Sequence, residues 1–193
     1  MKFDEISRPQ ELLNFMNKNM IHGYVGKSNN RLYKYSDKDF KTHWGEEYYL
    51  QSPSQLLASN HGVCWDKVEL ERYWFEKNKY NYKTIFIHFE MEEENEYPSH
   101  TFLVFEKENK WYWFEHSFLK HRGIHKYEKL NELIEDVKQK QLEIAIEIGV
   151  ATAEDYKLIK DYEYGTPQYG CDAEEFWKRI VIDPNWNTDN STK

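Results

Sequence analysis

Residues 62–76 read GVCWDKVELERYWFE, and this stretch decides the fold. Its apolar residues lie on several sides of the helical circle instead of forming one stripe, which is typical of a central, buried helix. The preceding Asn60-His61-Gly62 is a turn signal. We therefore predict a buried helix that begins at Gly62 or Val63 and ends near Glu76, with Cys64 in its first turn.

Three extended segments follow this helix. Residues 84–89 show an alternating pattern, residues 101–105 form a nearly continuous apolar run, and residues 111–114 are aromatic throughout. A short polar turn over Lys107–Lys110, which contains Asn109, predicts that the last two segments form an antiparallel hairpin. One helix followed by an antiparallel sheet predicts an α+β fold.

The flanking segments carry further patterns. Ser52 as N-cap and Pro53 at the first helical position predict a short helix that ends near Ala58. Residues 142–148 fit a helix and a strand, so both stay open there. We also predict a helix over Gln10–Asn19, an irregular segment over residues 23–50, an acidic connector over residues 92–96, an amphipathic helix containing Leu130 and Val137, and a helix from Thr152 to Lys160.

The length and composition indicate one domain. With 193 residues, 39% hydrophobic and 17% aromatic, we predict a single domain over residues 1–184 and a disordered tail over residues 185–193. The formal net charge of -8 argues against nucleic acid and against an anionic membrane surface as partners. No apolar run approaches the roughly 20 residues that span a bilayer, and Met1–Pro9 lacks the apolar region of a signal peptide. We therefore expect a cytoplasmic protein in which Cys64 and Cys171 are thiols, not a disulfide.

Cys64 is the first candidate for chemistry. At a helix start, free backbone N–H groups and the helix dipole favour the thiolate over the thiol. A nucleophilic cysteine needs a base within hydrogen-bond reach, and that base needs a group that orients it. His100 begins one strand of the predicted hairpin and Glu115 ends the other, so the turn brings them side by side. A lone cysteine here is more often a small buried side chain, but the histidine and the acid together favour a nucleophile.

Three motifs over about residues 50–120 resemble those of the transglutaminase-like superfamily: Gly62-Val63-Cys64-Trp65-Asp66, Ser99-His100-Thr101-Phe102 and Trp111-Tyr112-Trp113-Phe114-Glu115. That family has Gly-X-Cys at its catalytic helix, a histidine followed by a strand, and a tryptophan with an aspartate a few residues later. The resemblance implies Cys64 as nucleophile, His100 as base and Glu115 as the acid. Because Glu115 replaces the usual aspartate, His116 and Asp66 are rival groups for orienting the base.

The resemblance also implies a fold and a reaction. The fold would be papain-like and transglutaminase-like α+β, with a central helix carrying the cysteine packed on an antiparallel sheet carrying the histidine and the acid. The reaction would be acyl transfer from peptide-like amides through a thioester, by hydrolysis or transamidation, with a protein or peptide-like substrate and with no cofactor and no metal.

Three other functions stay open, and the sequence does not predict the oligomeric state. One is a catalytically inactive protein-binding module on the same scaffold. Another is acyl transfer like that of arylamine N-acetyltransferases, although no clear basic patch for the phosphates of an acyl-CoA is visible. The third is a toxin or effector that acts on a host protein.

Two residues near the motifs are candidates for contact with the substrate. Trp65 either forms a wall of an acyl groove or packs in the core, and its position favours neither. Gln51 precedes the catalytic helix, where its side-chain amide is a candidate second donor to the oxyanion.

Other polar groups fit less specific interpretations. A run of three imidazoles would suit a metal, but exposed loop histidines are the more common reason for such spacing: His116, His121 and His125. Three charged residues on the central helix are expected to form a solvated or ion-paired face: Glu69, Glu71 and Arg72.

Overall fold

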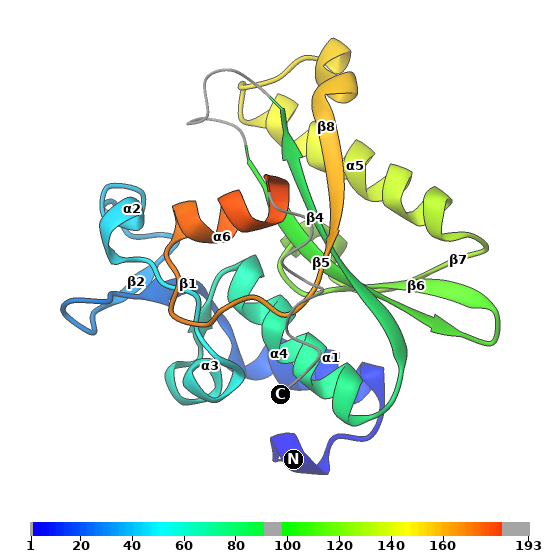
Figure 1. Cartoon of the computed structure of the whole chain (residues 1–193), viewed down its shortest axis with the longest axis horizontal. Helices are drawn as coiled ribbons and strands as arrows, with labels where there is room; N and C mark the ends of the chain where they lie inside the picture. Colours follow the sequence, from blue (N-terminus) through cyan, green and yellow to red (C-terminus); the bar gives the residue numbers. More distant parts are fainter. Residues whose placement is uncertain (1, 91–97, 183–193) are drawn as a thin grey trace.

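The computed structural model describes residues 2–90 and 98–182 (Figure 1). Its elements, with η marking a short 3₁₀ helix, are η1 Phe3–Glu5, α1 Pro9–Asn19, β1 Ile21–Val25, β2 Leu32–Lys34, α2 Trp44–Glu47, α3 Pro53–Ser59, β3 His61–Gly62, α4 Cys64–Lys77, β4 Asn81–Phe89, β5 His100–Lys107, β6 Lys110–Glu115, η2 Leu119–His121, β7 Gly123–Tyr127, α5 Leu130–Glu147, η3 Ala153–Leu158, β8 Ile159–Tyr164 and α6 Ala173–Val181. The predicted α+β class is confirmed. In the described part of the chain, the strands form a three-stranded sheet, β2-β1-β3, and a five-stranded sheet, β7-β6-β5-β4-β8.

The helix α4 is the central element that the sequence predicts. From Trp65 to Phe75 every residue except Tyr73 is buried. One part of the helix packs with α1 and the sheet through Leu70, Trp74 and Phe75. An α-helix can bury all its sides only between layers, and α4 lies between the sheet and the N-terminal segments.

The five-stranded sheet is antiparallel at every pairing. The predicted hairpin is confirmed as β5–β6, with Leu103 opposite Phe114. Its turn carries Glu108 and Asn109 at φ values of 55° and 58°. This left-handed conformation is one that asparagine adopts more readily than most residues, so Asn109 suits the turn. The hairpin register brings the start of β5 close to the end of β6.

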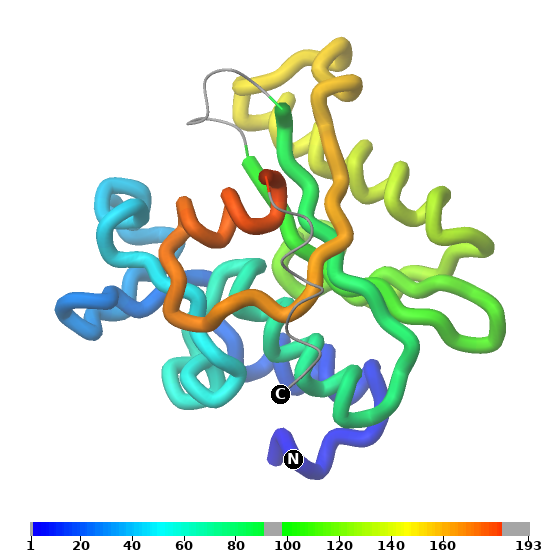
Figure 2. Tube along the Cα trace, in the orientation of Figure 1, coloured from blue at the N-terminus to red at the C-terminus, as the bar shows by residue number. Residues whose placement is uncertain are grey.

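Helices cover both sides of the sheet. One core joins β4, β5 and β6 to α5 through residues such as Ile87, Val104 and Val137. The opposite core joins β5 and β6 to α4 and α1. Figure 2 shows the same division along the chain, because the blue and cyan N-terminal third lies on one side of the green strands and the yellow α5 on the other. The alternation of strand side chains produces these two faces.

The small sheet fixes the entry to α4. Strand β3 pairs in parallel with β1, so that His22 lies opposite Gly62. A Cβ atom at Gly62 would lie 2.6 Å from Leu56 Cδ1 and 3.0 Å from Asp66 Cβ, so this close approach requires glycine. The predicted turn over residues 60–62 is therefore wrong in part. Only Asn60 takes a left-handed conformation, with φ of 57°.

The structure settles one open prediction and corrects another. Residues 142–148 continue α5 as far as Glu147, which settles the open choice in favour of a helix. The predicted helix from Thr152 to Lys160 is instead the short η3 followed by β8. Pairing with β4, in which Phe89 lies opposite Ile159, draws this segment into the sheet.

Some predictions fall where the structure gives no description. The acidic connector over residues 92–96 and the tail over residues 185–193 both lie outside the described residues. Among the residues that are described, no helix is both long and apolar enough to cross a membrane.

Candidate active site

Cys64 is the first residue of α4, as the sequence predicts. Val63 is the extended N-cap, and the Asp66 carboxylate reaches back to accept its N–H at 2.9 Å. The same carboxylate accepts the backbone N–H of Gln51 at 2.9 Å and the hydroxyl of Tyr48 at 3.3 Å. Burial raises the pKa of Asp66 to about 7, although its backbone hydrogen bonds oppose this shift. Asp66 thus fixes the start of the helix while the Cys64 side chain stays partly exposed.

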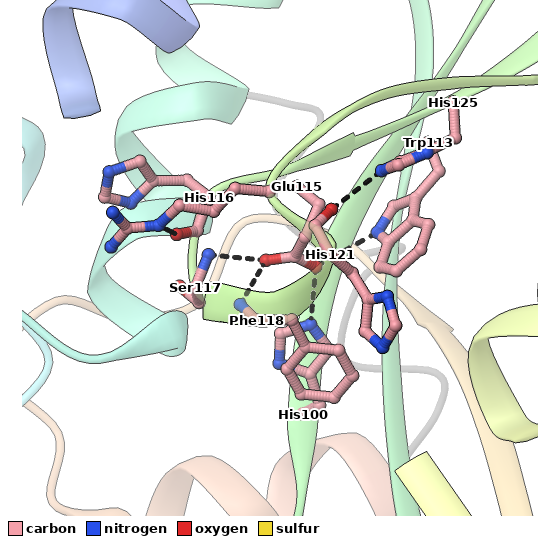
Figure 3. Close-up of polar contacts among 9 residues, drawn as sticks. His100, Trp113, Glu115, His116, Ser117, Phe118, His121 and His125 are labelled. Atoms are coloured by element: carbon pink, nitrogen blue, oxygen red, sulfur yellow. Dashed lines mark hydrogen bonds and ion pairs between the residues drawn. The ribbon is translucent and has the colours of Figure 1, made fainter. Parts of the chain in front are cut away.

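Glu115 is the last residue of β6, and both oxygens of its carboxylate accept hydrogen bonds (Figure 3). One oxygen accepts from His100 Nε2 at 2.8 Å and from Trp113 Nε1 at 3.1 Å. The other oxygen accepts the backbone N–H groups of Ser117 and Phe118, the latter at 2.7 Å. A buried carboxylate needs such a set of donors. Its position is therefore set by the turn that follows β6.

His100 begins β5 and is held on two sides. The ring of Phe118 stacks on it with centroids 3.7 Å apart and planes at 14°, and Glu115 holds Nε2. Burial alone lowers the pKa of His100. The Glu115 carboxylate and the Cys64 side chain outweigh burial and raise this pKa to about 9.

The ring of His100 also lies near the Cys64 side chain. The Cys64 side chain lies near enough to His100 to raise the pKa of the imidazole, and its charge favours the protonated ring. Because Glu115 occupies Nε2, Nδ1 is the nitrogen left to face the sulfur. The structure thus brings Cys64, His100 and Glu115 together from a helix start and two strand ends.

The length of Glu115 fits its place in the sheet. Leu103 pairs with Phe114, so the register continues to Phe102 opposite Glu115. His100, two residues before Phe102, is then the diagonal neighbour of Glu115 on the same face. Diagonal neighbours are farther apart than direct ones and are reached by long side chains. The glutamate side chain is long enough to span this diagonal.

The two rivals for orienting the base lie elsewhere. The Asp66 carboxylate is occupied by Tyr48, Gln51 and Val63. The ring of His116 points away from His100 in Figure 3. Burial lowers the pKa of His116 to about 2, so this ring is neutral. Glu115 is therefore the acid that contacts His100.

The candidate substrate residues have structural partners. Trp65 stacks on Phe176 at 4.3 Å and meets Tyr48 edge-on at 5.7 Å, which is core packing. Gln51 is buried, and its Nε2 donates to the carbonyl of His61 at 2.7 Å. One N–H of the Gln51 amide is left for another acceptor.

The imidazole run does not gather around a single point. His125 Nε2 lies 2.7 Å from the carbonyl oxygen of His121, and both rings lie against Trp113. Three of these histidines are part-buried or buried, which corrects the expectation of exposed loop residues: His116, His121 and His125. Within residues 2–90 and 98–182, no three His, Cys, Asp or Glu side chains form a group suited to a metal ion.

The charged face of α4 is buried and carries an ion pair, which fits the ion-paired alternative and not the solvated one. Arg72 pairs with Glu69 at 3.0 Å and donates to Thr84 Oγ1 at 2.6 Å. Two further charged residues on the same helix are almost fully buried: Lys67, to which sequence reasoning gave no role, and Glu71, which it placed only on the charged face. Positions 67 and 71 follow Cys64 by three and seven, which is the spacing of one helix face. That spacing was the available signal, but their charges did not indicate burial.

Comparison with known proteins adds no relative. No protein-family model matches the chain, and a search of curated proteins finds no match.

Proposed function

We propose that this chain is a cysteine-nucleophile enzyme that transfers acyl groups from peptide-like amides through a thioester. The proximity of Cys64 to His100, whose Nε2 is held by Glu115, carries the proposal. A nucleophile, a base and an orienting acid in series are what this chemistry needs. We also propose that the fold is papain-like and transglutaminase-like, because helix, His strand and acid strand follow in that order.

The first half of the reaction forms the thioester. The Cys64 thiolate attacks the amide carbonyl carbon, and the π electrons move to oxygen to give a tetrahedral oxyanion. Collapse of this intermediate breaks the C–N bond, and His100 gives its proton to the leaving amine. The products of this step are an acyl-Cys64 thioester, a free amine and a neutral imidazole.

The second half regenerates the enzyme. Water or a second amine attacks the thioester while His100 accepts a proton from it. The C–S bond breaks, and the thiolate and imidazolium are restored beside Glu115. Water gives net hydrolysis and an amine gives transamidation.

Glu115 stabilises the imidazolium and holds the ring in one orientation. Its other oxygen is fixed by two backbone N–H groups, so it does not follow a rotating ring. Backbone N–H groups at the start of α4 are suited to bind the oxyanion. The free N–H of Gln51 is a second donor in this proposal.

A thioester-capture assay tests the proposal. The chain is incubated with a panel of peptides containing glutamine or backbone amides, with hydroxylamine as the acceptor amine. We expect a hydroxamate product, the released amine or ammonia, and an acyl adduct on Cys64 by intact-protein mass spectrometry. Cys64→Ala should abolish all three. An adduct that persists in Cys64→Ala, or a panel that yields neither adduct nor product, would count against the proposal.

A further inference from the structure

Lys67 is a buried cation that the proposed mechanism does not use. Its side chain is 0% exposed, and its Nζ has no hydrogen-bond partner among the described residues. Burying an ammonium without a partner costs several kcal/mol on general grounds. A buried ammonium without a hydrogen-bond partner, three residues after a candidate nucleophile, is therefore a candidate for a functional role.

The helix geometry directs Lys67 toward Cys64. Lys67 follows Cys64 by three residues, so the two share a face of α4. The Cα–Cβ bonds of a helix tilt toward its N-terminus, and long side chains extend back over the preceding turn. The four-carbon stem of Lys67 therefore carries its ammonium toward the turn that begins with Cys64.

The electrostatics of the two groups agree with this direction. Burial lowers the pKa of Lys67 to about 8, and repulsion by Arg122 adds to the shift. The charge on Cys64 opposes the shift most, followed by the charges on Glu71 and Glu115. The ammonium form thus predominates at neutral pH. A Coulomb interaction acts equally on both partners, so an ammonium that a thiolate stabilises also stabilises that thiolate.

The neighbouring acids are poor partners for this ammonium. Burial raises the pKa of Glu71 well above its ordinary value, and the charge of Glu115 adds to that while the charge of Lys67 opposes it, so Glu71 is a weakened anionic partner. The Glu115 oxygens already accept four hydrogen bonds, and the Asp66 oxygens accept three. The Cys64 sulfur remains as a nearby group whose negative charge would favour the ammonium of Lys67.

The other titratable groups around the site do not take this role. Burial raises the pKa of Tyr48 and Tyr164 well above 10, so both phenols are neutral. Burial, followed by the charge of Lys67, lowers the pKa of His22 to about 3 and that of His116 to about 2. Arg122 donates its Nε to the His116 carbonyl at 2.7 Å.

We propose that Lys67 is a positioning residue whose buried ammonium holds Cys64 as the thiolate. The inference rests on the proposed function, since it explains how the nucleophile of that reaction is kept reactive. Lys67 supplies a fixed charge on the helix side of the sulfur, whereas His100 supplies a charge that moves during the reaction. A fixed charge stabilises the thiolate again after each turnover.

Alkylation of Cys64 tests this role without any substrate. The rate of iodoacetamide labelling at Cys64 is followed by peptide mass spectrometry from pH 4 to 10 in the full chain. We expect Lys67→Met to move the midpoint of this profile upward by about 1–2 pH units, the range produced by one nearby opposite charge. Lys67→Arg, which keeps the charge, should restore most of the shift.

Glu71→Gln is the matched control. It changes another buried polar side chain on the same helix face, one whose pKa burial raises, and should move the midpoint by only a few tenths of a pH unit. Circular dichroism is used to check that each variant is folded. If Lys67→Met does not fold, Lys67→Gln replaces it.

The outcomes separate the two proposals. A wild-type midpoint near that of an ordinary thiol, about 8.5, would contradict both the activated nucleophile and the role of Lys67. A low wild-type midpoint that stays unchanged in folded Lys67→Met or Lys67→Gln would overturn the role of Lys67 alone. A shift equal in Glu71→Gln and Lys67→Met would also overturn it, because repacking would then explain both.

Discussion

His100 Nε2 lies 2.8 Å from Glu115 Oε2, and each of these two side chains is 2% exposed. In water such a pair contributes little, but burial strengthens the attraction between charges. The carboxylate has lost its water and gained three other donors, so it is fixed before any substrate arrives. The site is therefore organised around Glu115, and the effects of changing it are specific.

Glu115→Gln should lower the acyl-transfer rate by about 10²–10⁴-fold, the range known for loss of an orienting acid. The amide is nearly the same size but cannot stabilise an imidazolium. Glu115→Asp should also lose activity, because the shorter side chain does not reach the diagonal position of His100. The exposed substitution Glu128→Gln serves as the control. Full activity in Glu115→Asp would contradict the argument from the register.

The pH dependence of stability should report the raised pKa of His100. In the folded state this pKa is about 9, against 6.5 in the unfolded chain. A raised pKa adds stability that is fully present below pH 6.5 and is lost as the pH rises through 9. The stability advantage of the wild type over His100→Gln, measured by urea unfolding, should therefore shrink between pH 6 and pH 9.5. An advantage that grows over this interval would show that the pKa is not raised.

Gly62→Ala should destabilise the fold by about 1–3 kcal/mol, the usual cost of overpacking. Gly62 lies in β3, the strand that leads into α4, and the added Cβ would lie 2.6 Å from Cδ1 of Leu56 in α3. Gly45→Ala is the matched control, because a Cβ there has no atom within 4 Å and should leave stability nearly unchanged. Chemical denaturation of both variants checks this. Equal stabilities would contradict the close approach at Gly62.

Arg72→Met should destabilise the fold by about 3–5 kcal/mol, because it leaves the Glu69 carboxylate buried without its charged partner. The double variant Arg72→Met, Glu69→Gln should recover part of this loss, since no buried charge remains. Urea unfolding of the wild type, the single variant and the double variant measures the recovery. A double variant less stable than the single one would show that the ion pair is not the main contribution.

The sequence predicted the parts of the fold that local patterns control. The buried helix that carries Cys64, the β5–β6 hairpin and the positions of His100 and Glu115 follow from periodicity, turn residues and spacing. The chemical roles of these residues stay predictions. The strands β3 and β8 were missed because each depends on a partner far along the chain, β1 or β4, which short-range patterns do not reveal.

The buried charges were only partly predicted, and the cause is different. The sequence predicted a solvated or ion-paired face for Glu69, Glu71 and Arg72 and gave Lys67 no role, because charge alone does not distinguish a solvated face from a buried, paired one. Only the tertiary structure shows that layers cover α4 on all sides and that these groups meet one another or the site. A helix with both apolar and charged residues around its whole circle is thus consistent with burial when the charges are paired or functional.

The central claim is that Cys64 is an activated nucleophile, and the relative alkylation of the two thiols tests it most directly. Cys171 is buried, and burial raises its pKa to about 12, so it serves as an internal reference. At pH 7 we expect iodoacetamide to label Cys64 at least 100-fold faster than Cys171, with a large loss of this rate in His100→Ala; about 1.4 kcal/mol corresponds to each tenfold step. Slow labelling of both thiols at similar rates, in a folded chain, would contradict the account.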